Sequence, residues 1–439
     1  MDAMATDFLD YEAQALLTRL DRVKPFALNQ VMAPAAGISR TAQLAIEHYL
    51  SQGRQELRKL IVEYRHWLTS GTARRAGVVE AQRRFTVLRL RFNKVLTQFD
   101  LFADALAQRS ERDSGIWLSG LDVLADDALG LPGYYNNPAV VCYLDRGVGA
   151  AIRRARTRLP GGGENPVAII RVPRERMVGN GVASSLVHEV GHQAAALLGL
   201  VESLRSVLQT RLARATSGER SAWQCYARWI SEIIADFWSV ARVGVTSTTG
   251  LIGVVSLPRA FVFRMHLDDP HPFPWIRVKL SCAIGRRLYP HPQWDRLAAL
   301  WQGFYPTRRL EADKLALLCR LEASLDEFLD LLLDHRPAAL HGRSLIEVMD
   351  LPRRQPRQLN ALHQRWLEQP SGMYRASPTL VFATLGQQRA NDQISPNEES
   401  ETLARLLVHW ALQRTLAHKL PDATHAPHPL PTPIPRLSK

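Results

Sequence analysis

The clearest pattern near the start of the chain is the recurrence of large apolar side chains at helical spacing in residues 41–69 and 78–109. The break at Ser70-Gly71-Thr72 predicts a turn between them, so we expect a long antiparallel helical hairpin. Such a hairpin could be a docking arm or could pack against the rest of the protein. The apolar positions are Leu50, Leu57, Leu60, Ile61, Tyr64 and Trp67 in the first segment and Phe85, Leu88, Phe92, Val95, Leu96, Phe99, Phe102 and Leu106 in the second.

Two short apolar runs in the middle of the chain, residues 138–144 and 166–172, are typical of β-strands. Pro166 and Pro173 bracket the second run, and proline hinders further strand pairing. We therefore expect 166–172 to be an edge strand. A plain core hairpin is the alternative.

Glycine and proline mark the segments that interrupt these patterns. Residues 111–134 are predicted to be a transition between regions, and residues 158–166 a flexible loop. The residues behind these predictions are Gly115, Gly120, Gly130, Pro132 and Gly133 in the first segment and Gly161-Gly162-Gly163 in the second.

Beyond residue 295 apolar residues again recur at helical spacing, which predicts a helical C-terminal region. The final stretch, from Pro421 to Lys439, is rich in proline and histidine, a composition typical of disordered or extended chain. His425 and His428 within it are better explained as solvated side chains than as metal ligands. The predicted helical segments are 296–303, 308–335, 343–349, 357–368 and 398–417.

Residues His188-Glu189-Val190-Gly191-His192 form an H-E-x-x-H motif. Residues four apart on a helix leave the same face, so both imidazoles can bind one metal ion. Glu189 then stands beside the open coordination position, where it can take a proton from water instead of binding the metal. The alternative is a buried helix whose two histidines are hydrogen-bonded core groups.

A metal site of this type needs a third protein ligand and a fourth position left for water. Glu232 and Asp236 lie four residues apart in a largely apolar segment, where carboxylates are costly unless they are paired or metal-bound. This spacing favours Glu232 as the third ligand and Asp236 as the acceptor of a hydrogen bond from the far nitrogen of a ligand histidine. A carboxylate pair that meets Arg228 or Arg242 is the alternative.

The sequences H-E-V-G-H at 188–192 and E-I-I-A-D at 232–236 resemble the motifs of the gluzincin metallopeptidases. The closer similarity is to the family of the CAAX-prenyl endopeptidases and the bacterial heat-shock membrane peptidases. That family also carries H-P-x-x-x-x-R beyond the third ligand, and His271 to Arg277 have this spacing. The resemblance covers about residues 135–295, in the order of the motifs and not as continuous similarity.

The resemblance implies a Zn²⁺ ion bound by His188, His192 and Glu232. It also implies that His271 and Arg277 hold the substrate or the tetrahedral intermediate; a turn that caps a helix is the alternative for this segment. Zinc peptidases of this kind place a strand upstream of the metal helix, and its free edge can pair with an extended substrate. Unlike the membrane members, this chain has no apolar run of 18 residues without charge, so no transmembrane helix is expected.

Together these patterns predict a mainly α protein with a small β-sheet (α+β), in which a zincin-like peptidase core is flanked by helical regions. The expected parts are a helical N-terminal region with the long hairpin (1–110), the metallopeptidase core (111–295), a helical C-terminal region (296–420) and the Pro/His-rich tail (421–439).

Composition narrows the choice of partners and location. The formal net charge is +13, but the arginines are spread along the chain and no nucleic-acid-binding signature is present, so no nucleic-acid partner is expected. The four cysteines form no C-x-x-C pair and are expected to be reduced. The first residues lack a basic and then apolar leader, which predicts a cytoplasmic location, with signal-independent export left open. Nothing in the pattern defines an oligomeric state.

Two functions from different classes remain. The first is a soluble zinc-dependent endopeptidase that acts on a protein or peptide substrate. In it Glu189 moves protons, and Tyr289, His271 or Arg277 stabilises the oxyanion. The second is a peptidase-fold binding or scaffold protein that acts through its helical arms. The intact Glu189 favours the first, because a purely structural metal has no use for a base beside an open position.

Overall fold

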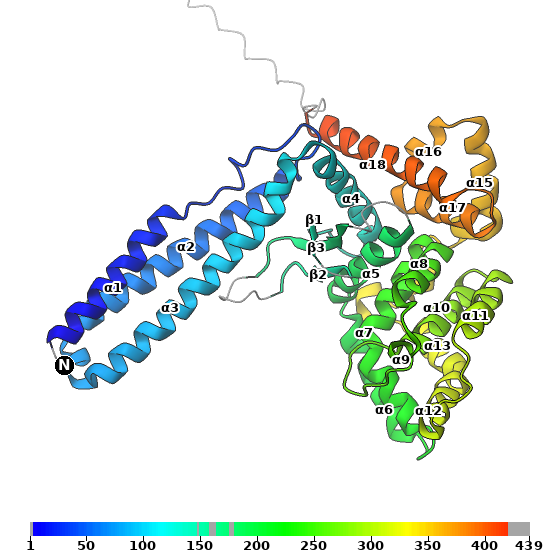
Figure 1. Cartoon of the computed structure of the whole chain (residues 1–439), viewed down its shortest axis with the longest axis horizontal. Coiled ribbons are helices and arrows are strands. Elements are labelled where there is room, and N and C mark those ends of the chain that lie inside the picture. Colours follow the sequence, from blue (N-terminus) through cyan, green and yellow to red (C-terminus); the bar gives the residue numbers. More distant parts are fainter. Residues whose placement is uncertain (1–2, 147–148, 158–163, 175–179, 420–439) are drawn as a thin grey trace, which may run out of the picture.

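The computed structural model describes residues 3–146, 149–157, 164–174 and 180–419. This part of the chain forms a long helical arm and a larger helical body, with one three-stranded sheet where they meet (Figure 1). The prediction of a mainly α protein with a small β-sheet is thereby confirmed. The predicted tail at 421–439, and residues 158–163 of the predicted flexible loop, lie outside the described residues.

Three helices form the arm: α1 (Ala3–Arg22), α2 (Arg40–Leu68) and α3 (Gly71–Ala107). The predicted hairpin is present as α2 and α3, and α1 packs against both. Ser39 and Ser70 cap the N-termini of α2 and α3 by accepting backbone N–H groups. The N-terminus lies at the outer end of the arm (Figure 1).

The sheet contains β1 (Val140–Asp145), β2 (Ala151–Arg153) and β3 (Ala168–Pro173) in the order β1-β3-β2. The prediction that 166–172 is an edge strand is wrong, because β3 pairs in parallel with β1 on one side and antiparallel with β2 on the other. Pro166 precedes β3 and Pro173 is its last residue, so the amides between them remain free to pair on both sides. The edge strands are β1 and β2.

The two faces of the sheet pack against different parts of the protein. Val141 and Ile169 contribute to the apolar core of the arm. Cys142 and Ile170, which alternate with them along the same strands, contribute to the core of the body. The sheet therefore fixes the base of the arm to the body.

The body has one continuous hydrophobic core that includes residues from Leu118 to Trp410. The expected limit near residue 295 therefore does not separate two cores. The helices around the site are α4 (Arg112–Leu129), α5 (Asn180–Leu197), α6 (Leu200–Arg214), α7 (Arg220–Val243), α8 (Val245–Val255), α9 (Arg259–Val262) and α10 (Pro274–Leu288).

Helix α4 corrects the prediction that residues 111–134 are only a transition. Glycines in this segment indicate breaks in a helix, but Gly120 lies inside α4, where α4 crosses the last helix of the chain. A Cβ added there would meet the Leu407 carbonyl oxygen at 2.4 Å. Glycine thus serves close packing at this position, at a modest cost in helix propensity.

The C-terminal helices pack on the outside of the same core. The predicted helix at 308–335 is interrupted at Ser324, and the buried helix α17 was not predicted. The helices are α11 (Gln293–Phe304), α12 (Ala312–Ala323), α13 (Leu325–Leu333), α14 (Leu345–Val348), α15 (Pro356–Glu368), α16 (Ser371–Arg375), α17 (Pro378–Ala390) and α18 (Pro396–Lys419). Among the described residues, no helix is long and apolar enough to cross a membrane.

A buried ion pair ties these parts together. Arg109, at the base of the arm just after α3, is fully buried and donates two 3.1 Å hydrogen bonds to the Asp122 carboxylate on α4. Asp122 also accepts from the Cys142 amide of β1 at 2.7 Å and from Arg414 of α18 at 3.2 Å. One carboxylate therefore joins the arm, the sheet and the C-terminal helix.

We expect Asp122→Ala to lower the free energy of unfolding by about 3 kcal/mol or more, because it leaves two arginines without their shared counter-charge. Urea unfolding followed by circular dichroism measures this loss. Asp113→Ala, an exposed position on the same helix, is the matched control and should change stability by less than about 1 kcal/mol. Equal losses in the two variants would contradict the role of Asp122.

Candidate metal centre

The site is built where α5 crosses α7. At the crossing, Gly191 of α5 lies against Ala235 of α7, and a Cβ added to Gly191 would be 2.8 Å from the Ala235 Cα and 3.0 Å from its carbonyl oxygen. No side chain fits between the two backbones at this point. The small residues therefore bring the polar side chains of both helices within contact distance.

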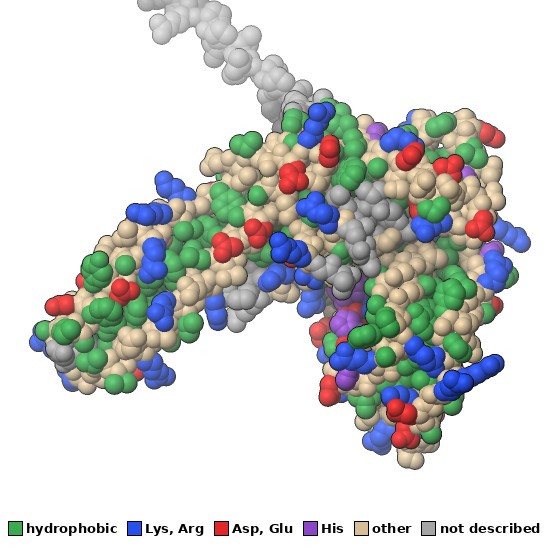
Figure 2. Space-filling view, viewed as in Figure 1, with side chains coloured by type: hydrophobic (Ala, Val, Ile, Leu, Met, Phe, Trp, Pro, Cys, Tyr) green, Lys and Arg blue, Asp and Glu red, His purple; other side chains and the backbone are tan. Residues whose placement is uncertain are grey.

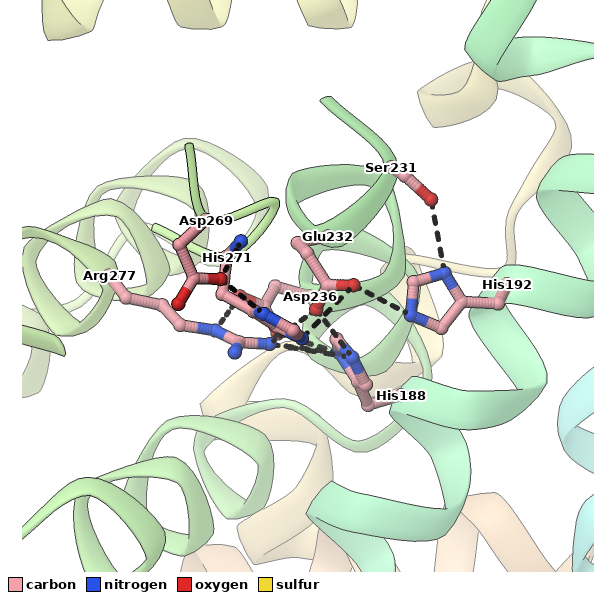
Figure 3. A network of polar contacts seen from close by, with 8 residues as sticks. All are labelled: His188, His192, Ser231, Glu232, Asp236, Asp269, His271 and Arg277. Atoms are coloured by element: carbon pink, nitrogen blue, oxygen red, sulfur yellow. Dashed lines mark hydrogen bonds and ion pairs between the residues drawn. The ribbon is translucent and has the colours of Figure 1, made fainter. Parts of the chain in front are cut away.

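Three side chains from the crossing could hold one metal ion: His188 and His192 of α5 and Glu232 of α7 (Figure 3). The Nε2 atoms of His188 and His192 each lie 3.3 Å from an oxygen of the Glu232 carboxylate. Ligand atoms at zinc distances of about 2.0–2.1 Å, in tetrahedral geometry, stand about 3.3 Å apart. The donor set and its spacing thus fit a tetrahedral divalent ion such as zinc.

The Nδ1 atom of each histidine contacts a side-chain oxygen of α7. Asp236 Oδ1 lies 2.8 Å from His188 Nδ1, and Ser231 Oγ lies 3.3 Å from His192 Nδ1. These contacts leave the Nε2 atoms to point toward Glu232 (Figure 3). Such partners orient a ligand imidazole and select its tautomer.

Arg277 of α10 contacts two carboxylates of the same cluster. Its Nε and Nη2 atoms donate to the two oxygens of Asp236, at 2.7 and 2.9 Å, and Nη2 also lies 3.3 Å from Glu232 Oε2. The bidentate pair fixes the carboxylate that in turn holds His188. Arg277 lines the cavity as expected, but most of its hydrogen bonds support the residues around the candidate metal position.

The electrostatics of the cluster favour a cation at this point. Burial disfavours the charged form of His188, but the Asp236 and Glu232 carboxylates outweigh it and raise the pKa of His188 to about 9. Burial likewise opposes ionisation of Asp236, yet Arg277 and His188 lower its pKa to about 2. Burial raises the pKa of Glu232, but hydrogen bonds from His188 and His192 outweigh this effect and hold the pKa well below the ordinary range.

His271 reaches the cavity from the loop that precedes α10. Asp269 accepts from both the backbone N–H and the Nδ1 of His271, at 2.9 and 2.8 Å, and thereby fixes the ring. The Nε2 atom then faces the site, 3.7 Å from Glu232 Oε1, while just over half of the side chain remains exposed. When the ring is protonated on both nitrogens, Nδ1–H donates to Asp269 and Nε2–H can donate to a substrate oxygen.

The structure does not bring Tyr289 to the site, which corrects its proposed oxyanion role. The side chain is 1% exposed, and its hydroxyl donates to the Ala241 carbonyl at 2.6 Å. Burial raises the pKa of this phenol above its ordinary range. A tyrosine committed to an internal hydrogen bond cannot serve a substrate in the cavity.

The cavity has a volume of about 460 Å³, in the range of small-molecule and peptide sites. Glu189 lies on its wall, beside the three candidate ligands. Opposite α5, the segment that ends in β2 forms the other wall, and α8 contributes apolar side chains. The remaining lining residues include Gly149, Ala150, Ala151, Ile152, Arg154, Ser184, Ser185, Ser247, Leu251 and Val254.

Three contributors to the site were not predicted. Ser231 contacts His192, and Gln193 Oε1 accepts from the Ala155 amide at 2.8 Å, next to the cavity wall. Both neighbour a predicted ligand in sequence, but nothing in the pattern distinguishes them from ordinary helix residues. Asp269 carried a usable signal, because an aspartate two residues before a histidine can accept from that residue's backbone N–H.

Comparisons with known proteins add no relative to this picture, since no protein-family model, no curated protein and no solved structure matches the chain.

We expect Gly191→Ala to destabilise the fold by about 1–3 kcal/mol, because the added Cβ meets the backbone of Ala235 and forces α5 and α7 apart. Thermal or urea unfolding measures the effect. Gly253→Ala on α8 is the matched control, since its Cβ would meet nothing within 4 Å. It should leave stability unchanged or raise it by up to about 1 kcal/mol. Similar behaviour of the two variants would show that the crossing tolerates a methyl group.

Proposed function

We propose that this protein is a zinc-dependent endopeptidase. The observation that carries the proposal is the convergence of His188, His192 and Glu232 on one point of a cavity whose wall also holds Glu189. Three protein ligands with an adjacent carboxylate that is not a ligand are the arrangement of a catalytic metal, whereas a structural zinc normally has four protein ligands.

Two imidazoles and one carboxylate suit zinc among the common divalent metals. When bound there, zinc would act as a Lewis acid toward the scissile carbonyl and would make water a stronger acid. Asp236, Ser231 and Arg277 keep the ligand side chains in place for it.

The chain's own residues supply the proton transfers. Glu189 accepts the proton of the attacking water and delivers it to the nitrogen of the departing amine. His271, oriented by Asp269, donates from Nε2–H in its protonated, imidazolium form to the oxygen that becomes negatively charged. Arg277 adds positive charge nearby, and its main part is to position the ligands through Asp236.

Strand β2 is suited to hold the substrate backbone. Among the described residues only β3 pairs with it, which leaves its second edge without a strand partner in that part of the chain, and residues of this segment line the cavity. An extended peptide can add to such an edge by main-chain hydrogen bonds. The open edge thus lies on β2 and not on residues 166–172 as expected from the sequence.

The arm favours a second candidate, a binding protein that retains a peptidase fold. It projects from the body, and α3 is continuous from Val78 to Ala107 after a kink at Gly77 (Figure 1). A binding function of this kind would need neither the metal nor Glu189, so the metal-ligand variants and Glu189→Gln below separate the candidates.

Purified wild-type protein should contain about one zinc ion per chain, and His192→Ala or Glu232→Ala should remove most of it. Asp236→Asn should weaken zinc affinity about 10–100-fold without abolishing binding, because this residue touches a ligand and not the ion. Elemental analysis and competition with a chelating dye measure both effects. His48→Ala and Asp268→Asn, at exposed positions, are the controls. Unchanged zinc content in the ligand variants would refute the assignment.

Glu189→Gln should keep its zinc and its fold but lose peptide hydrolysis by about a thousandfold or more, because an amide cannot accept the proton. Hydrolysis of a mixed peptide library, followed by mass spectrometry, is the measurement. Glu202→Gln, an exposed position on the next helix, should cleave like wild type. Equal rates for Glu189→Gln and wild type would remove Glu189 from the reaction, and a wild type that contains zinc but cleaves nothing would favour the binding function.

A further inference from the structure

The wall of the cavity formed by β2 carries one cation at a defined position, Arg154. Ile152 of β2 and Arg154, the first residue after β2, both line the cavity. Residues two apart in extended chain lie on the same face. Arg153 points to the opposite face, toward the arm, and does not line the cavity. In the register with β3, Ile152 pairs with Ile170 and Arg153 with Ile169, which agrees with this assignment of faces.

The backbone around Arg154 is held firmly. The Asn165 side-chain amide donates to the carbonyls of Arg153 and Arg154, at 3.0 and 3.1 Å. The next amide, that of Ala155, donates to Gln193 Oε1 at 2.8 Å. Gln193 is buried and directly follows the candidate ligand His192. The position of Arg154 is therefore fixed relative to the metal helix.

Arg154 and Arg277 are the two arginines among the described residues that line the cavity. Glu232 and Asp236 are balanced by His188 and Arg277. Arg154 is exposed, and within the described part of the chain no carboxylate pairs with it. Figure 2 shows further Lys and Arg side chains where the arm meets the body. This wall thus offers a positive charge to whatever lies along β2.

We propose that Arg154 selects peptide substrates with an acidic side chain, Asp or Glu, at one position of the segment that pairs with β2. Directly opposite residues of neighbouring strands project from the same face, with Cβ atoms about 4.5–5.5 Å apart. A carboxylate opposite Arg154 therefore reaches its guanidinium, and the residue two positions away, opposite Ile152, meets an apolar surface. The inference rests on the proposed peptidase function and specifies its substrate class.

Peptide binding to zinc-loaded Glu189→Gln protein tests the selectivity without cleavage. The probes are fluorescein-labelled decapeptides of alanine and leucine, in which a single Glu, Gln or Lys is moved through each position. At one position, Glu should bind about fivefold more tightly than Gln, the strength of an exposed ion pair, and the preference should shrink at high salt. Adding Arg154→Glu should reverse the preference to Lys. Arg153→Glu, the same change on the opposite face, should preserve it.

The outcomes separate this inference from the proposed function. Wild-type protein that cleaves the peptide library without an acidic preference would overturn the role of Arg154 and leave the peptidase intact. A preference that survives Arg154→Glu, or that Arg153→Glu reverses instead, would also overturn it. Neither binding nor cleavage of any peptide would overturn both. A preference at one position that reverses only in the Arg154 variant supports the inference.

Discussion

The close approach of α5 and α7 is the constraint on which the site depends. Gly191 and Ala235 let the two backbones meet where any larger pair of side chains would hold them apart. The ligand atoms then fall into place one helical turn or less from the contact, because His192 follows Gly191 and Asp236 follows Ala235 in sequence. The distances within the polar cluster therefore depend on the packing of Gly191 against Ala235, because any change that separates the two helices also separates these side chains.

Much of the candidate site could be predicted, because its parts follow helical spacing. Residues four apart on α5 and on α7 share a face, so the four polar residues on them could be paired before their tertiary contact was known. The supporting contacts could not be predicted in the same way. These contacts are made by Ser231, Gln193 and Asp269. They depend on how segments far apart or irregular in structure come together, and the hydrophobic periodicity of the sequence does not specify this. Tyr289 was an error of this kind, because its sequence position says nothing about which carbonyl its hydroxyl meets.

The fold was predictable where a helix has one buried stripe and one solvated face, as in α2 and α3. It was not predictable for α17, whose residues from Pro378 to Gln388 are buried on all sides and so lack an amphipathic period. In α4, Gly120 looked like a break because close helix packing and a helix end use the same residue. The order of the strands also escaped prediction, since the prolines mark the ends of β3 but not the number of its neighbours.

The sheet has a consequence for reach, because its two faces pack against the arm and the body. Because α3 is continuous only from Val78 to Ala107, beyond a kink at Gly77, the outer end of the arm stands on the order of 45 Å from its base. A protein held at that end could deliver only a loose segment of about 15 extended residues to the cavity. A shorter segment would end along the arm, before it reached the body.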